Sequence, residues 1–251
     1  MNQVVVKVGT GVLTRESDGQ LDGASLVRLV TAIAGLIEQG NRVVLVSSGA
    51  VGAGISGLGL IEYPDDVPTR QACAAVGQTR LMHAYENLFR NFGLSVAQLL
   101  LTAHDLEDEK RCQRVQDTLN KLSDYSTIIP IINENDSVAV EELSVGDNDM
   151  LSCKVATLIG AKQLILLTTV DGLMPPDGGE ILTEVTDVDE VLDFARDDSG
   201  KFSIGGMASK LQAVKKAVDA GIETVIANGR YPERVNEIIS GNGLCTRFLT
   251  K

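Results

Sequence analysis

The stretch that decides the fold is "LVRLVTAIAGLIEQGNRVVLVSSGAVGAG", residues 26–54. It opens with apolar residues at helical spacing, which are Leu26, Val30, Ile33 and Ile37. This period predicts an amphipathic helix, and Gly40 stands where that helix should stop. Val43 to Val46 is a short β-branched run of the kind that forms a buried strand. A helix, a glycine and a strand in this order predict part of a βαβ unit.

The same pattern continues on both sides of this stretch. Four further apolar runs predict buried parallel strands: Val4 to Val8, Thr127 to Ile132, Gln163 to Thr168, and Glu223 to Ala227. Leu211, Val214 and Val218 predict a helix before the last run, with Gly221 as its stop. No internal repeat or proline-rich linker divides the chain, so we expect one α/β domain. Within it Pro130 is unusual, because proline cannot donate to a central ladder.

Composition restricts the class of protein. At 251 residues the chain can bury a sizeable core, and with 4% aromatic residues the interior must be filled by aliphatic side chains. The net charge of −12 argues against a surface for nucleic acid or anionic membranes, since both need clustered Lys and Arg. The four cysteines form no C-x-x-C pair, and the sequence shows no leader and no apolar span. We therefore expect a cytoplasmic protein.

Polar and glycine-rich segments follow the predicted strands. They are Lys7 to Gly11, Ser47 to Gly52, Asn133 to Asp136, Thr168 with Thr169, and Asn228 with Gly229. In open α/β sheets, ligands bind beyond the carboxyl ends of the strands. Each segment alone could be an ordinary turn, but five at one edge of a sheet predict a binding site.

The first half of the chain suits an anionic ligand, although two common nucleotide-binding motifs are missing. Thr14 stands where the third small residue of G-x-G-x-x-G would be, and no G-x-x-x-x-G-K-[ST] occurs. Lys7 lies in an apolar run, where its ammonium is costly to bury unless it meets an anion. The alternative is an edge-strand lysine that faces water. The amides of Ser47 to Gly54 could hold a negative group, or they could form only a tight turn.

A second lysine comes from "SIGGMASK", residues 203–210. Gly205 and Gly206 would let a ligand approach the backbone closely, and Lys210 could neutralise a transferring phosphoryl group. The alternative is a helix entry with a solvated lysine. Together with Lys7, this segment predicts a clamp of two lysines.

Two tracts of alternating amides and carboxylates lie in "IINENDSVAVEELSVGDNDML", residues 131–151. Asn133 to Asp136 ends a predicted strand, and Asp147 to Asp149 opens a predicted helix. Both tracts could be no more than turn and cap residues. Between them, Ser137 to Val145 alternates in hydropathy and predicts a hairpin arm beside the sheet.

Taken in order, Lys7, "SSGAVGAG", "NEND", "VGDNDML" and "GGMASKLQA" resemble the motifs of the amino acid kinase family, from Lys7 to about Phe248. "PIINEND" followed by "VGDND" is more similar to the branch that phosphorylates glutamate than to those that act on acetylglutamate, aspartate, carbamate or UMP. The resemblance implies a three-layer αβα sandwich with a largely parallel central sheet, as a single domain over residues 1–251. A glutamate site is expected in a lobe up to about residue 150, a nucleotide site in a lobe from about 151, and no C-terminal PUA domain.

The implied reaction is ATP-dependent phosphorylation of the γ-carboxylate of L-glutamate to L-glutamyl 5-phosphate, the first step of proline biosynthesis, with Mg²⁺ accompanying ATP. A hydroxyl acceptor would need a general base, but a carboxylate with a pKa of about 4.3 is already an anionic nucleophile at neutral pH. His83 and His104 lie outside the motifs and at no metal-ligand spacing, so we expect them to be structural. No protein ligands for a metal are predicted.

The resemblance also implies roles for single residues. Lys7 and Lys210 would hold the transferring phosphoryl group, Asp149 would orient both lysines, and Gly49 would add a backbone amide. Glutamate would be bound by Ser48, Asp136 and Asn148. The ATP site would be lined by Lys7, Thr168, Thr169, Ile204, Gly205, Gly206, Met207, Ala208, Ser209 and Lys210.

The resemblance further implies a homo-oligomer, dimer or tetramer, and feedback inhibition by proline through the segment Leu101 to Leu119. Three alternatives stay open. One is a kinase of the same fold with a different acidic acceptor, such as acetylglutamate or aspartate. Another is a catalytically silent sensor of the same fold, against which the two lysines and Asp149 speak. The last is a dehydrogenase, which the missing third glycine argues against.

Overall fold

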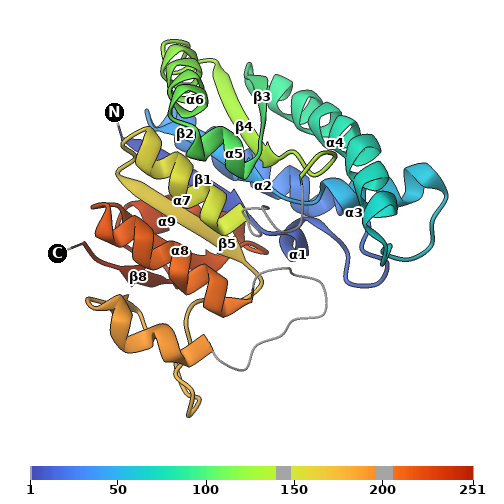
Figure 1. The fold of residues 1–251 in the computed structure, drawn as a ribbon. Helices are drawn as coiled ribbons and strands as arrows, with labels where there is room; N and C mark the ends of the chain where they lie inside the picture. Colours follow the sequence, from blue (N-terminus) through green and yellow to red (C-terminus); the bar gives the residue numbers. More distant parts are fainter. Residues whose placement is uncertain (1, 140–147, 196–205, 251) are drawn as a thin grey trace.

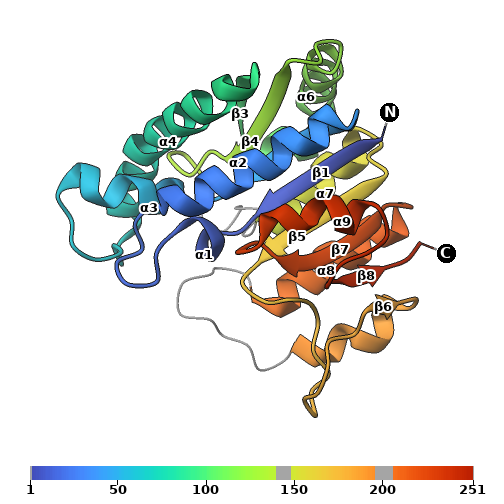
Figure 2. The same ribbon diagram turned by 180° about the vertical axis from the view of Figure 1, so that it is seen from behind.

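The computed structural model describes residues 2–139, 148–195 and 206–250. These residues form an eight-stranded sheet in the order β3-β4-β2-β1-β5-β7-β8-β6, with helices on both faces (Figures 1 and 2). The strands are β1 Gln3–Val8, β2 Arg42–Ser47, β3 Ser95–Leu101, β4 Ile128–Glu134, β5 Gln163–Thr168, β6 Glu184–Val185, β7 Glu223–Asn228 and β8 Thr246–Phe248. All paired strands are parallel except β7 and β8.

Helices connect most of the strands. The α-helices are α1 Thr10–Leu13, α2 Gly23–Glu38, α3 Ala50–Ile55, α4 Val67–Phe89, α5 Ala103–Glu107, α6 Glu109–Leu122, α7 Asn148–Leu158, α8 Met207–Asp219 and α9 Val235–Ile239. Short 3₁₀ helices cover Ser56–Leu58, Arg90–Phe92, Val188–Ala195 and Pro232–Arg234. In the described ranges no helix has both the length and the apolar character needed to span a bilayer.

The alternation of side chains along β1 explains the three layers. Val4, Val6 and Val8 pack into one core with α1, α2, α4 and α9. Val5 packs into a second core with α6, α7 and α8, on the opposite face. Because successive residues of a strand point to opposite faces, Lys7 shares the face of Val5. The predicted αβα sandwich is confirmed, and Lys7 lies on the side of α7 and α8.

The five predicted strands are present, each within two residues of its expected bounds. β3 was not predicted, and it lies at the edge of the sheet, paired only with β4. Pro130 does lie inside β4, an interior strand. The β2–β4 ladder begins at Leu45 opposite Ile131, while Pro130 is paired only with Ala97 of β3. The proline therefore lies just before the part of β4 that pairs with β2.

Helices α3 and α4 approach each other through glycines. A Cβ atom on Gly77 would lie 1.8 Å from the carbonyl oxygen of Ala50, and one on Gly54 would lie 1.9 Å from that of Cys73. No side chain fits at either position without moving a helix backbone. The start of α3, and the loop that leads into it from β2, are therefore held against α4.

Candidate active site

Two lysines meet one carboxylate at the carboxyl end of β1. Lys7 Nζ lies 2.6 Å from Asp149 Oδ1, and Lys210 Nζ lies 2.5 Å from Asp149 Oδ2. The exposed fractions are 5% for Lys7, 0% for Asp149 and 7% for Lys210. Burying charges is tolerated only when they are paired, and here two ammonium groups share one carboxylate. Two ammonium groups are thus held at the edge of the sheet where ligands bind, and such groups suit a phosphoryl group.

The local fold explains how residues so distant in sequence meet. Lys7 is the fifth residue of β1, Asp149 lies in the first turn of α7, and Lys210 lies in the first turn of α8. β1 is central in the sheet, and α7 and α8 pack side by side over the face to which Lys7 points (Figure 1). The predicted pairing of the two lysines is thus present, and Asp149 lies between them.

The loop after β2 lies beside this trio. Gly49 has a φ of +96°, a left-handed conformation that suits glycine, and it precedes α3 without a side-chain cap. The Ser48 amide donates to the carbonyl of Val8, which joins the loop to the end of β1. Ser47 Oγ and the buried Tyr85 hydroxyl lie 2.9 Å apart. The segment "SSGAVGAG" thus leads from the end of β2 into α3.

The two amide-carboxylate tracts meet at this loop. The Asn148 Nδ2 group shares its two hydrogens among three acceptors, which are Ser48 Oγ at 2.8 Å, the carbonyl of Ser47 at 3.2 Å and Asn133 Oδ1 at 2.9 Å. Asn133 Nδ2 in turn donates to Gln78 Oε1 at 3.0 Å. Ser48 and Asn148, both predicted to bind the substrate, are therefore adjacent. Gln78 was not predicted, because a glutamine in the middle of a long helix carries no sheet-edge signal.

Asp136 lies in the turn after β4 and is half-buried. Burial, together with the neighbouring Glu134 carboxylate, raises the pKa of its carboxyl to about 6. Within the described ranges no hydrogen bond joins Asp136 to Ser48 or Asn148. The structure places it one turn beyond Asn133, on the same edge of the sheet.

The predicted nucleotide residues fall into two groups. Thr168 ends β5, and Thr169 follows it beside Gly11, whose added Cβ would lie 3.0 Å from Thr169 Cγ2. Gly206 is the N-cap of α8, and as a glycine it offers no side chain to cap the amides of the first turn. Met207, Ala208 and Ser209 form that first turn together with Lys210.

Some predictions fall outside the described residues. These are the loop residues Ile204 and Gly205, the tract residue Asp147, and the part of the hairpin arm from Val140 to Val145. Of the arm's first residues, Ser137 and Val138 lie in the turn that contains Asp136. No cluster of three His, Cys, Asp or Glu side chains able to hold a metal exists in the portion of the chain that is described.

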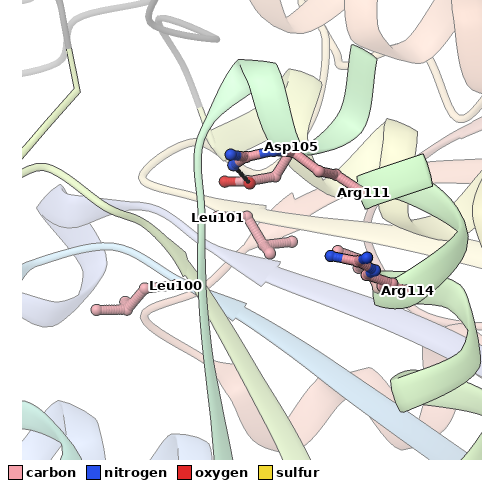
Figure 3. A pocket seen from close by; sticks show the side chains of 6 residues that line it. Leu100, Leu101, Asp105, Arg111 and Arg114 are labelled. Atoms are coloured by element: carbon pink, nitrogen blue, oxygen red, sulfur yellow. Dashed lines mark hydrogen bonds and ion pairs between the residues drawn. The ribbon is translucent and has the colours of Figure 1, made fainter. Parts of the chain in front are cut away.

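An open hollow of about 400 Å³ lies at the end of β3, the strand next to β4 (Figure 3). It is lined by Leu100, Leu101, Asp105, Arg111, Arg114 and Val115. Arg111 Nη1 pairs with Asp105 Oδ1 at 2.8 Å. The segment Leu101 to Leu119 contains the last residue of β3, all of α5 and most of α6. Leu101 lies opposite Glu134 of β4.

Comparison with known proteins gives consistent matches. The model of the amino acid kinase family matches residues 2–228. A glutamate 5-kinase from Clostridium acetobutylicum is 44% identical over 257 residues, covering 100% of this chain and 96% of that protein. A glutamate 5-kinase from Nostoc is 43% identical, covering 98% of this chain and 67% of that protein.

The fold also matches a solved structure. Carbamate kinase from Giardia lamblia bound to AMP-PNP superimposes with a TM-score of 0.69 at 17% identity, covering 100% of this chain and 99% of that one. At this identity the likeness concerns the fold alone. It agrees with the largely parallel sheet flanked by helices.

Proposed function

This chain belongs to the amino acid kinase family, and on that premise we propose that it transfers the γ-phosphoryl group of ATP to the γ-carboxylate of L-glutamate. The product would be L-glutamyl 5-phosphate, which begins proline biosynthesis. The observation that carries the proposal is the buried trio of Lys7, Asp149 and Lys210 at the carboxyl end of the sheet. The similarity to glutamate 5-kinases over the whole chain supports glutamate as the acceptor.

The proposed step needs no general base. A γ-carboxylate oxygen of glutamate attacks the γ-phosphorus, and the bond from that phosphorus to the bridging oxygen of ADP breaks. The carboxylate is ionised at neutral pH, so no proton moves. The activation barrier comes from bringing two anions into line. Positively charged groups lower this barrier by neutralising the transferring phosphoryl group. Lys7 and Lys210 would supply this charge, Asp149 would fix their positions, and the Gly49 amide would add a neutral donor.

On the nucleotide side, Thr168, Thr169 and the α8 start from Gly206 to Lys210 would line the ATP site. Amides at a helix N-terminus favour phosphate, and α8 has no acidic residue in its first turn. Mg²⁺ usually binds through one or two carboxylates, water and substrate phosphates. Since Asp149 is engaged by both lysines, Mg²⁺ would be held mainly by the phosphates of ATP, whose charge it would screen.

On the amino-acid side, Ser48, Asn148 and Asp136 would bind glutamate. The Asp136 carboxylate offers a negative charge for the α-ammonium group, and the Ser48 hydroxyl and Asn148 amide offer neutral hydrogen bonds. The glutamate site would thus lie in residues up to about 150 and the nucleotide site in those after it. One continuous sheet carries both sets of residues.

The raised pKa of Asp136 makes a testable prediction. A carboxyl with a pKa of about 6 loses its charge as the pH falls through that value. If the charge binds the α-ammonium group, kcat/KM for glutamate should fall with decreasing pH below about 6, approaching about tenfold per pH unit, because kcat/KM reports the free enzyme. Steady-state kinetics between about pH 5 and pH 8 would measure it.

The matched variant for this prediction is Asp136→Asn. It should have a lower kcat/KM for glutamate at neutral pH, and its pH profile should lack the fall in kcat/KM below about pH 6. KM for ATP serves as the internal control and should change little with the substitution. If kcat/KM of Asp136→Asn still fell below about pH 6 as in the wild type, another group would be the one that titrates.

The proposed function is tested by a hydroxamate assay with ATP and Mg²⁺. Hydroxylamine traps acyl phosphates, so we expect product when L-glutamate is the acceptor and none above background with N-acetylglutamate or aspartate. Product with one of the other acceptors alone would assign a different kinase of this family. Nucleotide binding without product from any acceptor would favour a catalytically silent sensor.

The proposal extends to assembly and control. A homo-oligomer is expected, and sedimentation of the purified protein would give its size. Inhibition by proline is expected, since the segment Leu101 to Leu119 begins one strand from Asn133. Rates measured with proline added at fixed glutamate would test this expectation.

A further inference from the structure

The amides of Asn148, Asn133 and Gln78 form a chain that leads from Ser48 into the core. Two backbone groups fix the orientation of this chain. The Asn148 atom that faces the Ser47 carbonyl must be nitrogen, because a carbonyl oxygen only accepts. The Asn133 atom that faces the Glu134 amide, 2.9 Å away, must be oxygen, because an amide N–H only donates.

These two assignments determine the remaining one. With Asn133 Oδ1 turned toward Asn148 and Glu134, its Nδ2 faces Gln78. The Gln78 atom at 3.0 Å must therefore be the oxygen Oε1. Gln78 thus stabilises the one orientation of Asn133 in which an oxygen is offered to Asn148.

The orientation of Asn148 has a consequence for ligands. The two hydrogens of its Nδ2 are shared among Ser48 Oγ, the Ser47 carbonyl and Asn133 Oδ1, so this group has no hydrogen left for a ligand. Its Oδ1 is buried, and within the described ranges it has no hydrogen-bond partner. Buried polar atoms are normally paired, so this oxygen is an acceptor that suits a donor from a bound molecule.

We propose that Gln78 is a positioning residue for the amino-acid substrate. Its Oε1 holds Asn133, and Asn133 holds Asn148, so that Asn148 presents a carbonyl oxygen to the α-ammonium group of glutamate. The proposal rests on the proposed function, since it names the substrate of that site. Gln78 itself acts through the two asparagines.

The burial of Gln78 argues against a role in packing alone. The side chain is 8% exposed, and it follows Gly77, which contacts the start of α3. Its Nε2 is buried without an acceptor in the described part of the chain. An unpaired buried donor destabilises the fold, whereas an apolar side chain of this size would not. The glutamine is explained by what its oxygen does for Asn133.

Three variants of residue 78 separate these roles. Gln78→Met keeps the length and removes the acceptor. Gln78→Glu keeps an oxygen that can accept from Asn133, whether or not the carboxyl is ionised. Gln78→Lys offers only a donor. For the acceptor-free variants we expect KM for glutamate to rise about tenfold with KM for ATP within about twofold, and for Gln78→Glu a KM for glutamate within about threefold of wild type.

The matched control is Gln163→Met. Gln163 is equally buried at 8% and donates to Glu223 at 2.6 Å, but it begins β5 at the opposite end of the sheet. This variant should lose thermal stability without a change in either KM. Unfolding curves of all variants show whether each is folded at the assay temperature. If Gln78→Met does not fold, the comparison of Gln78→Lys with Gln78→Glu tests the proposal.

The outcomes separate the two proposals. A wild-type enzyme without glutamate-dependent product would overturn both. With an active wild type, an unchanged KM for glutamate in Gln78→Lys or Gln78→Met would overturn the role of Gln78 alone. The role of Gln78 would also be overturned if KM for glutamate rose equally in Gln163→Met. The same holds if KM for glutamate in Gln78→Glu were as high as in Gln78→Met.

Discussion

Asp149→Asn is expected to lower kcat by about 10²-fold or more, the usual effect of losing charge stabilisation at a transferring group. The amide carries no charge and its single oxygen can accept from only one of the ammonium groups of Lys7 and Lys210, which in the wild type lie within 2.6 Å of the two carboxylate oxygens. Their mutual repulsion should move them apart, so both donors lose their positions. Breaking a buried ion pair on one side typically costs about 3–5 kcal/mol, so the melting temperature should fall as well.

The hydroxamate assay and a thermal unfolding curve measure these two effects. Asp105→Asn is the matched control, since Asp105 also pairs with a basic residue, Arg111, but at the partly exposed start of α5. It should retain kcat within about twofold, because partly exposed pairs contribute little. A kcat for Asp149→Asn close to that of this control would contradict the role of Asp149.

Lys210→Ala is expected to lower kcat by about 10²-fold, with KM for glutamate changed only a few-fold. The truncation removes one of the two ammonium groups and leaves Asp149 paired with Lys7. The loss should appear in kcat rather than in KM, because Lys210 would stabilise the negative charge that is spread over the phosphoryl oxygens in the transition state.

Lys215→Ala provides the control on the same helix. Lys215 pairs with Asp189 at 2.9 Å and is partly exposed, so its removal should leave kcat unchanged. Single-turnover measurements would separate the chemical step from product release in both variants. If Lys210→Ala turned over glutamate within a few-fold of wild type, the clamp of two lysines would be wrong.

Much of the fold could be predicted because the central strands are buried on both faces. β1, β2, β5 and β7 are continuous apolar runs, which the sequence shows directly. β3 could not be recognised in the same way. It is an edge strand with several partly exposed side chains, so it resembles neither a buried run nor a strict alternation.

The candidate site could be predicted in part. The rule that ligands bind at the carboxyl ends of strands predicts that Lys7, Ser48 and Asn133 lie at one edge of the sheet. The contact of Lys7 with Asp149 depends on which face of β1 the lysine uses and on which helices cover that face. Spacing along the chain does not contain this information. Gln78 was missed because its partner, Asn133 of β4, lies 55 residues away in the sequence.

The contact of Gly54 and Gly77 has a consequence for redesign of acceptor specificity. With α3 pressed directly on α4, the loop that carries Ser48 has no freedom to retreat from a larger substrate. Room for a bulkier acceptor would have to come from the turn after β4, where Asp136 is half-buried. Changes in selectivity are therefore best sought in the turn after β4 and not in the loop that α3 and α4 hold in place.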